Sequence, residues 1–289
     1  MATPKPFQHL QDWITQQWVI LTGRRVNAKT DSWLLGPFGQ TGTIGDAFVD
    51  HLAQQEDLMV ERNCTSCGLI PSFDTLSLSK QATSKLADDI IDFYQHTGTY
   101  DLAFGAKWNP VFLMFGKLLN MLFSARLNQL NIPTQQQDSP GAINSELIAL
   151  TERKSGQLKY VIWYRTFKAT GKVLYSGVYT TCTTPSGIVC VKAVFPLPNG
   201  NATVILEPEV TENGAFTLRS AGAQHGDAGF YFLLQDATGT VWSRYVRTFE
   251  DTLTVQPDAG HLKAKQILRI WKQKVVTFTY RISRKTGTG

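Results

Sequence analysis

The chain has 289 residues, of which 43% are hydrophobic and 18% charged, so it can bury a sizeable core and carries too little charge for a disordered protein. Its length suits one large domain or two smaller ones. The formal charge of +5, from 28 basic and 23 acidic residues, is too small an excess to indicate an anionic partner or to exclude one.

The first residues lack the features of an export signal. Residues 1–10 contain a single basic residue, Lys5, and no apolar run of signal-peptide length. We therefore expect a cytoplasmic protein whose four cysteines are reduced thiols. Large apolar residues recur every three or four positions from Phe7 to Trp18, which predicts a short amphipathic helix.

The rest of the first half also favours helices. Residues 46–55 have helical periodicity, whereas residues 58–62 fit a short strand. Ser84 is a suitable N-cap for a helix that would bury the apolar residues between Leu86 and Tyr94. These patterns predict a mainly helical region at residues 1–135 that packs on the second half of the chain.

Residues 109–130 are nearly all apolar and approach the length of a membrane span. Asn109 can cap a helix there, and Pro110 suits its first turn. Lys117 and Arg126 lie inside the run, however, which argues against spanning. We therefore predict a helix but no transmembrane segment, with contact at a membrane surface as one use of its apolar side.

Part of this segment resembles uncharacterised bacterial proteins of unassigned function. The similarity is carried by residues 115–119, 122–124 and 126–133, and so falls mainly within residues 110–133. The resemblance implies a bacterial origin. It brings no established activity and no catalytic residues, because none is assigned to that family.

A stretch rich in Pro, Gln, Thr and Ser at residues 131–140 is interpreted as a linker to a second region at residues 145–285. There, runs rich in Val, Tyr, Phe, Thr and Ile alternate with turn residues, which is typical of an antiparallel sandwich or barrel. The predicted strands are 146–151, 160–167, 173–183, 188–195, 202–209, 215–220, 229–235, 241–255, 261–271 and 275–283. The expected fold class is α+β, with a mainly helical N-terminal half followed by a calycin-like antiparallel β-barrel or sandwich.

Basic residues are densest at residues 263–285, where they alternate with apolar ones. In a strand, this alternation indicates a solvated face opposite a buried face. Since the stretch has no arginine-rich run or RNA-recognition signature, we predict no nucleic-acid partner.

The four cysteines form two local pairs. Cys64 and Cys67 have the spacing of a metal-chelating or redox-active pair, but a structural zinc needs two further ligands and Gly68 favours a loop. We therefore predict no metal. Cys182 and Cys190 flank turn residues 185–187, which would place the two thiols opposite each other across a hairpin. Two packed thiols are expected, and a disulfide stays open as the alternative.

Other candidate motifs favour structural roles. The glycines at 36, 39, 42 and 45 match neither the dinucleotide nor the P-loop fingerprint, so we predict no cofactor. His225, Gly226 and Asp227 are typical of a turn, and the nucleophile elbow G-x-S-x-G is absent from the sequence. Glu207 and Glu209 would share one strand face, where an exposed acidic edge is expected.

The aromatic-rich second half suggests a binding function. An antiparallel barrel of eight or more strands commonly encloses a ligand-sized cavity. The residues predicted to line it are Tyr164, Arg165, Tyr179, Tyr231, Trp242 and Arg244. By analogy from fold to function, we predict non-enzymatic binding of a hydrophobic, lipid-like small molecule with an acidic end.

Two alternatives belong to other functional classes. In the first, the helix at residues 109–130 docks a partner, as in an interaction or scaffold protein. In the second, His225 and an acid meet a serine or cysteine, as in a hydrolase-type enzyme. The sequence does not indicate which ligand is bound, what the oligomeric state is, or whether the sheet closes.

Overall fold

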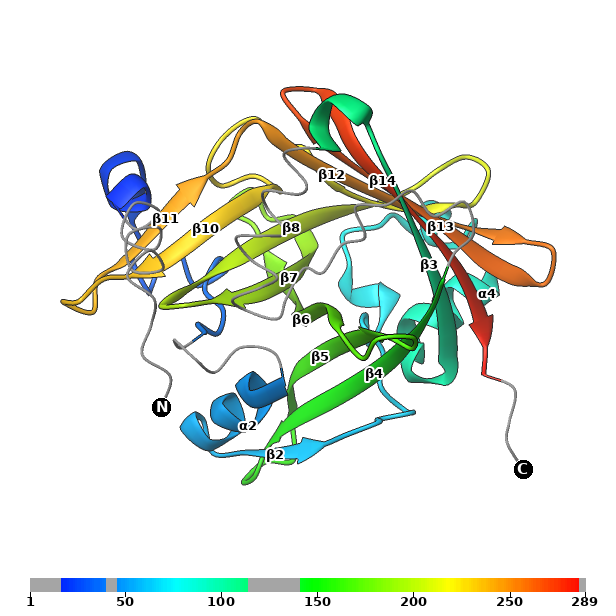
Figure 1. The fold of residues 1–289 in the computed structure, drawn as a ribbon, viewed down its shortest axis with the longest axis horizontal. Helices are drawn as coiled ribbons and strands as arrows, with labels where there is room; N and C mark the ends of the chain where they lie inside the picture. The colour runs from blue at the N-terminus through cyan, green and yellow to red at the C-terminus, as the bar shows by residue number, and fades with distance from the viewer. Residues whose placement is uncertain (1–16, 40–45, 114–140, 286–289) are drawn as a thin grey trace.

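A computed structural model describes residues 17–39, 46–113 and 141–285 of the chain. Fourteen antiparallel strands lie within these residues and belong to one sheet (Figure 1). In chain order they are β1 (Arg24–Arg25), β2 (Leu58–Glu61), β3 (Tyr100–Trp108), β4 (Gly141–Glu152), β5 (Leu158–Phe167), β6 (Val173–Thr183), β7 (Val189–Leu197), β8 (Gly200–Val210), β9 (Phe216–Ser220), β10 (Phe230–Gln235), β11 (Val241–Tyr245), β12 (Phe249–Asp258), β13 (His261–Ile270) and β14 (Gln273–Arg284).

Ten of the strands close into a barrel. Neighbours pair in the order β8-β7-β6-β5-β4-β3-β14-β13-β12-β9, and β9 pairs again with β8 to complete the ring. The sheet forks at β8, because Gly200 to Val204 pair with β10 whereas Glu207 to Val210 pair with β9. Strands β10, β11 and β1 therefore extend from the barrel as a flap, and β2 adds to β4. Of the predicted barrel or sandwich, the structure has the barrel.

The prediction of a mainly helical first half is wrong. Its described part holds helical residues at 17–22. It also holds the short helices α2 (Asp46–Gln55), α3 (Lys80–Thr83) and α4 (Asp88–Gln95), and the 3-10 turns η1 (Phe73–Thr75), η2 (Thr97–Thr99) and η3 (Pro110–Phe112). The same half contributes β3 to the barrel, between β14 and β4. In β3, Tyr100, Leu102 and Phe104 are buried and alternate with partly exposed residues, which is the strand period.

Several local predictions are confirmed and others are shifted. The helix at residues 46–55 and the strand near residues 58–62 are present as α2 and β2. Ser84 does not cap α4, which begins at Asp88, but ends α3. Asn109 does act as a cap, since its side chain accepts a hydrogen bond from the Val111 N–H at 3.1 Å. Residues 1–16, most of the helix predicted at 109–130, and the linker at 131–140 lie outside the described residues.

The ten strands predicted in the second half correspond to eleven. The segment predicted as one strand at 241–255 is divided into β11 and β12. At the break, the Phe249 N–H donates to the Val246 carbonyl at 3.1 Å, which closes a turn. This turn takes the chain from the flap, where β11 pairs with β10, into the ring, where β12 pairs with β13 and β9.

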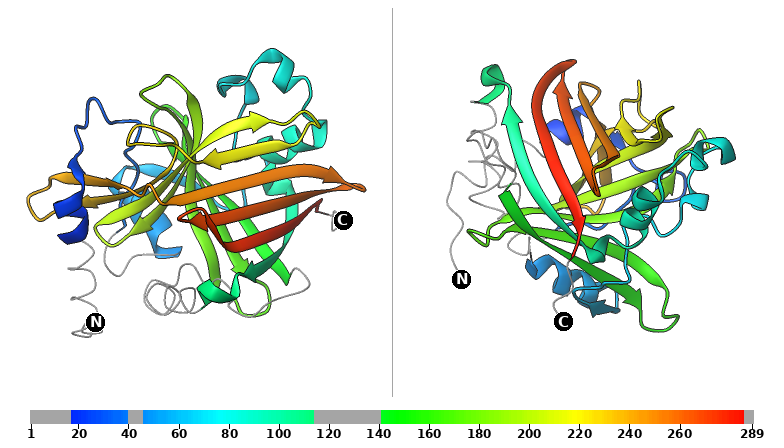
Figure 2. Two further views of the ribbon diagram at one scale, coloured as in Figure 1. Left: turned by 90° about the horizontal axis from the view of Figure 1, so that it is seen from above. Right: turned by 90° about the vertical axis from the view of Figure 1, so that its right-hand side faces the viewer.

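Three apolar clusters pack against the barrel wall, one on the inside and two on the outside. The largest lines its interior. On the outside, α2 packs Phe48, Val49 and Leu52 against buried residues of β4, β5, β6 and β7 (Figure 2). A third cluster places Trp33 and Leu34 against residues of β6, β7, β8 and β10. The segment around Trp33 therefore covers a second part of the outer surface.

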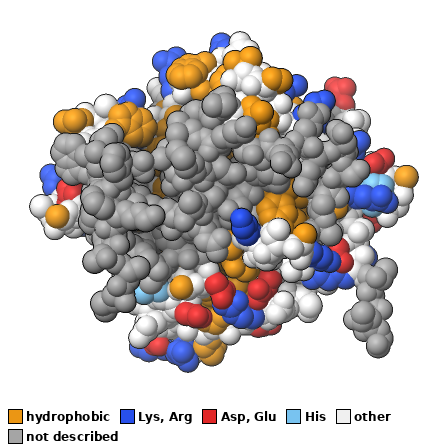
Figure 3. Space-filling model, viewed as in Figure 1, with side chains coloured by type: hydrophobic (Ala, Val, Ile, Leu, Met, Phe, Trp, Pro, Cys, Tyr) orange, Lys and Arg blue, Asp and Glu red, His pale blue; other side chains and the backbone are white. Residues whose placement is uncertain are grey.

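Helix α4 lies at one end of the barrel in both views of Figure 2. Its Tyr94 ring meets Phe216 of β9 at 5.1 Å between centroids, and its other neighbours include Phe73 and Phe93. Gly68 allows the preceding loop to approach this helix, because a Cβ atom there would lie 2.2 Å from the Tyr94 carbonyl oxygen. On the face shown in Figure 3, acidic and basic side chains are interspersed over the lower part, near α2, β2 and β4.

Candidate functional site

The barrel encloses a cavity of about 430 Å³, a size within the usual range of small-molecule sites. Strand alternation builds its wall, since every second residue of β12 from Phe249 to Val255 faces it. Apolar side chains from β3, β7, β8, β9, β12, β13 and β14 make up most of the surface. The charged, amide-bearing and hydroxyl-bearing side chains among the described lining residues are Arg165, Asp251, Gln266, Tyr94, Tyr175, Tyr179 and Tyr280.

Arg165 is the buried cation of this cavity. Its side chain comes from β5, and the residue is only 5% exposed. The guanidinium carbon lies 4.0 Å from the Trp163 ring centroid and 4.9 Å from that of Tyr175, in cation-π contact with both. One terminal nitrogen donates to the Tyr179 hydroxyl at 3.4 Å, whereas Nε is buried without a hydrogen-bond partner.

No described carboxylate forms an ion pair with Arg165. A buried guanidinium is costly unless an anion or several acceptors compensate its lost hydration. The aromatic faces of Trp163 and Tyr175 compensate part of that loss. The geometry therefore leaves this cation able to receive an anionic or strongly accepting group of a bound molecule.

Asp251 of β12 is the buried carboxyl group of the same cavity. It is 6% exposed, and its Oδ2 accepts a hydrogen bond from Gln266 Nε2 at 2.7 Å. Tyr280 in turn donates to Gln266 Oε1 at 3.1 Å. Asp251 Oδ1 has no hydrogen-bond partner and is buried. Burial raises the pKa of Asp251 to about 7, although the hydrogen bond from Gln266 acts in the opposite direction.

Arg165 and Asp251 stand on opposite walls. In the ten-stranded ring, β5 and β12 are separated by four strands on either side. Tyr280 relates the two, because it interacts electrostatically with Arg165 and donates to Gln266, which donates to Asp251. Burial raises the pKa of Tyr175, Tyr179 and Tyr280, so these phenols stay neutral. These polar side chains thus form one band in an otherwise apolar cavity.

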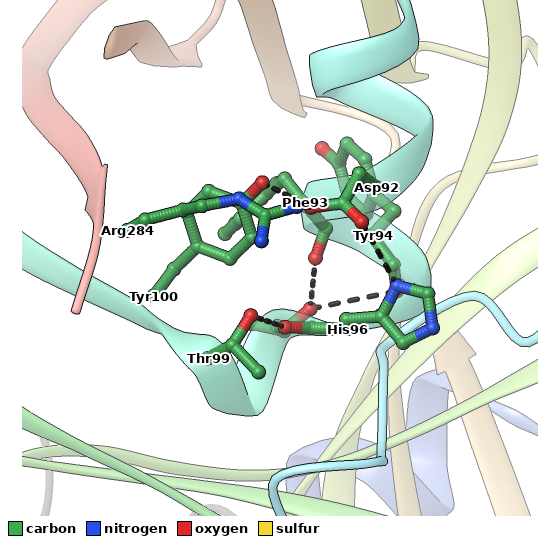
Figure 4. Close-up of polar contacts among 8 residues, drawn as sticks. Asp92, Phe93, Tyr94, His96, Thr99, Tyr100 and Arg284 are labelled. Atoms are coloured by element: carbon green, nitrogen blue, oxygen red, sulfur yellow. Dashed lines mark hydrogen bonds and ion pairs between the residues drawn. The ribbon is translucent and has the colours of Figure 1, made fainter. Parts of the chain in front are cut away.

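Polar contacts of Asp92 hold helix α4 at the end of the barrel. Figure 4 shows Tyr100 and Arg284 directed at the Asp92 carboxylate from one side and His96 from the other. The Tyr100 hydroxyl donates to Asp92 Oδ2, Arg284 approaches the same oxygen at 2.5 Å, and His96 Nδ1 lies 3.1 Å from Oδ1. Burial acts to raise the pKa of Asp92, but its partners lower it overall. The cluster ties α4 to β3 and β14.

Of the six residues predicted to line a cavity, the structure places two in its wall, Arg165 and Tyr179. Tyr164 packs outside the barrel, in the cluster under α2. The other three lie in the flap region. Tyr231 donates its hydroxyl to the Asp227 carbonyl at 2.6 Å, Trp242 donates to Asp236 at 2.8 Å, and Arg244 donates to the Thr22 carbonyl at 2.5 Å.

Sequence reasoning did not select Asp251, Gln266 or Tyr280. A signal for Asp251 was present, because it alternates with Phe249, Leu253 and Val255 and so falls on the apolar face of its strand. A carboxyl group in that register is either paired or functional.

The chain is similar to the uncharacterized membrane protein YndJ of Bacillus subtilis (strain 168), with 25% identity over 198 residues. The similar region covers 68% of this chain and 34% of that protein. The chain thus spans about a third of its relative's length, and the resemblance to uncharacterised bacterial proteins is confirmed to this extent. No protein-family model matches the chain, and no solved structure matches it significantly.

Within residues 17–39, 46–113 and 141–285, no helix combines the length and apolar character needed to cross a membrane. Nor do His, Cys, Asp and Glu side chains in those ranges gather in groups of three that could hold a metal ion.

His225 has one of the partners that a hydrolase would require. Its Nε2 lies 3.0 Å from the hydroxyl oxygen of Ser243, which is 1% exposed. Nδ1, however, faces the Arg24 guanidinium at 3.5 Å, where a catalytic triad has an acid. Burial lowers the pKa of His225, and the charge of Arg24 lowers it further. This arrangement suits a partly buried hydrogen-bonded histidine better than a general base.

The cysteine predictions have different outcomes. Cys64 and Cys67 form a disulfide, so the expectation of reduced thiols is wrong for this pair. Backbone hydrogen bonds from Cys64 to Leu147 and from Gly98 to Cys67 fold the loop, and the two Cα atoms lie 5.5 Å apart, a distance suited to a disulfide. Cys182 and Cys190 do face each other across the hairpin, as buried free thiols.

Proposed function

We propose that this protein binds a hydrophobic small molecule with an acidic end inside its barrel, in a lipocalin-like manner and without covalent chemistry. The observation that carries the proposal is Arg165, a guanidinium that is 5% exposed in a mostly apolar cavity and has no ion-pair partner among the described residues. An anionic group of a ligand would complete its coordination, since guanidinium and carboxylate groups form strong charge-assisted hydrogen bonds.

The shape and chemistry of the bore support an apolar body for this ligand. Its volume of about 430 Å³ suits one small molecule, and its walls are mostly aliphatic and aromatic. Barrels of eight strands already hold a single small ligand in lipocalins, and ten strands give a wider bore. The similarity to a bacterial protein described as a membrane protein makes lipids one source of apolar acids.

The first test is native mass spectrometry of gently purified protein, with solvent extraction of any molecule that leaves the protein on denaturation. A discrete apolar acid in the extract is the expected result. The direct test is calorimetric titration with decanoate, comparing the wild type with Arg165→Met. We expect affinity to fall about 10- to 100-fold in the variant, because a charge-assisted hydrogen bond contributes about 1.5–3 kcal/mol.

Arg244→Met is the matched control, because Arg244 lies outside the cavity, on β11. Its affinity for decanoate should equal that of the wild type. A wild-type protein that binds neither decanoate nor longer apolar acids would refute the proposal. Equal affinity of the wild type and Arg165→Met would remove Arg165 from the binding site.

A further inference from the structure

The hydrogen bonds around Asp251 determine which of its carboxyl oxygens is left without a partner. Tyr280 donates to Gln266 Oε1 at 3.1 Å, so the amide group of Gln266 directs its NH2 towards Asp251. That NH2 donates to Oδ2 at 2.7 Å, which makes Oδ2 an acceptor. Any proton on the carboxyl group must therefore sit on Oδ1, the buried oxygen without a partner.

The surroundings of Asp251 do not favour its charged form. Among the described residues, no cation forms an ion pair with it. The hydroxyl oxygen of Ser220 on β9 accepts a hydrogen bond from the backbone N–H of Asp251, not from its carboxyl group. On β13, Gln266 is its neutral donor, and the other charged group of the cavity, Arg165, is on the opposite wall.

The remaining titratable groups that face this space are phenols. Tyr94 comes from α4, Tyr175 and Tyr179 from β6 and Tyr280 from β14, and burial keeps all four neutral by raising their pKa values. Burial also raises the pKa of Asp251 to about 7, which agrees with the geometric argument. The cavity therefore holds one fixed positive charge and one carboxyl group that can be neutral or negative.

We propose that Asp251 makes binding of the ligand's acidic end depend on its own protonation: the acid binds beside Arg165, which supplies the positive charge, when Asp251 carries a proton on Oδ1. The inference rests on the proposed function. A ligand carboxylate and a protonated Asp251 leave the cavity with no net charge, because the ligand balances Arg165. If both carboxyl groups were ionised, the same buried space would contain an uncompensated negative charge. Binding of an apolar acid is thus coupled to uptake of one proton from solvent when Asp251 starts ionised.

The test measures the dissociation constant of decanoate for the wild type at pH 6, 7 and 8. Decanoate stays ionised throughout, since carboxylic acids of this type titrate near pH 4–5, roughly as Glu does at about 4.3. If only the protonated form of Asp251 binds, affinity should be about tenfold weaker at pH 8 than at pH 6. The neutral analogue 1-decanol should show no such pH dependence.

Proton uptake can be observed without any variant. Calorimetric titrations at pH 8 in two buffers with different ionisation enthalpies should give different heats for decanoate, with a slope that corresponds to close to one proton taken up per ligand. Equal heats in both buffers, or a wild-type affinity independent of pH, would overturn the inference while the proposed function stands. No binding of decanoate at any pH would overturn both.

Asp251→Asn provides a sharper comparison. Because Gln266 donates towards this position, the new amide should turn its oxygen to Gln266 and place its NH2 where the protonated acid has Oδ1–H, so that it imitates the neutral acid. We expect this variant to bind decanoate at pH 8 as tightly as the wild type does at pH 6, with no pH dependence. Glu250→Gln, on the outward face of the same strand, should keep the wild-type pH dependence. A tenfold loss at pH 8 in Asp251→Asn would contradict the assignment.

Discussion

The guanidinium carbon of Arg165 lies 4.0 Å from the centre of the Trp163 ring, two residues earlier on the same face of β5. Both side chains face the cavity. A cation-π contact contributes about 0.5–2 kcal/mol, which is less than the cost of burying an unpaired guanidinium. The ligand-free protein should therefore be destabilised by this arginine.

The Arg165→Met variant tests that conclusion. Methionine keeps a flexible apolar stem of similar length and removes the buried charge. We expect the free energy of unfolding without ligand to equal or exceed that of the wild type by about 1 kcal/mol, even though decanoate binds more weakly. Urea unfolding followed by fluorescence measures the difference. A destabilisation of more than about 2 kcal/mol would show that the aromatic contacts outweigh the desolvation of the charge.

Asp251 should make the stability of the ligand-free protein depend on pH. Its pKa is about 7 in the folded state and near 3.8 when unfolded, so the folded protein binds the extra proton between these values. The stabilisation is fully present below about pH 4 and is lost as the pH rises to about 7. Asp251→Asn should remove this dependence and be more stable than the wild type at pH 8, by on the order of 3 kcal/mol.

Urea unfolding of both proteins at pH 5 and pH 8 checks this expectation. The stability advantage of the variant over the wild type should be about 2–3 kcal/mol larger at pH 8 than at pH 5. Glu250→Gln, whose side chain lies outside the cavity wall, serves as the control for a change of charge on β12. An equal difference between variant and wild type at the two pH values would mean that Asp251 is not the group that titrates.

The strands could be predicted from sequence more fully than the site. Period-two alternation identifies most of the second half, but the pairing partner of a strand depends on long-range contacts that no local pattern contains. Residues 241–255 illustrate this limit, since reading them as one strand placed Trp242 and Arg244 in the barrel and left Asp251 unremarked. Arg165 was identified because an arginine between aromatic residues is conspicuous in the sequence itself.

The contacts of Asp92 predict a second dependence of folding stability on pH, with the opposite sign to that of Asp251. Its pKa is lowered in the folded state, so the stabilisation is present above about pH 4, the unfolded value, and is lost as the pH falls through the folded pKa. Tyr100→Phe removes one hydrogen bond to this carboxylate. We expect it to lower the free energy of unfolding at pH 7 by about 1–2 kcal/mol and to have less effect at pH 3.

Hydrogen exchange of the α4 amides and urea unfolding can both follow this change. Faster exchange in α4 of Tyr100→Phe at pH 7 would agree with its role in fastening the helix to the barrel. Asp89→Asn is a suitable control, because Asp89 is an exposed residue of the same helix. Unaltered stability of Tyr100→Phe at pH 7 would mean that packing of Phe93 and Tyr94 alone holds α4 in place.

Lys192 of β7 fixes the segment that covers the outside of the barrel. It is 6% exposed, and its Nζ donates to the carbonyl of Trp33 at 3.0 Å and to that of Leu35 at 2.8 Å. Lys192→Met would keep the stem but leave both carbonyls without this donor. We expect a loss of about 2–4 kcal/mol in the free energy of unfolding, since hydrogen bonds to charged groups contribute about 1.5–3 kcal/mol each and are not additive.

Thiol labelling distinguishes local detachment from general destabilisation in this variant. Cys182 lies in the cluster that contains Trp33 and Leu34, so release of the segment should expose its thiol to a labelling reagent. The labelling rate should rise in Lys192→Met under conditions where the barrel stays folded. Lys172→Met, at an exposed position before β6, should label as slowly as the wild type. If Lys192→Met also labels slowly and loses no stability, apolar packing of Trp33 and Leu34 suffices to hold the segment against the barrel.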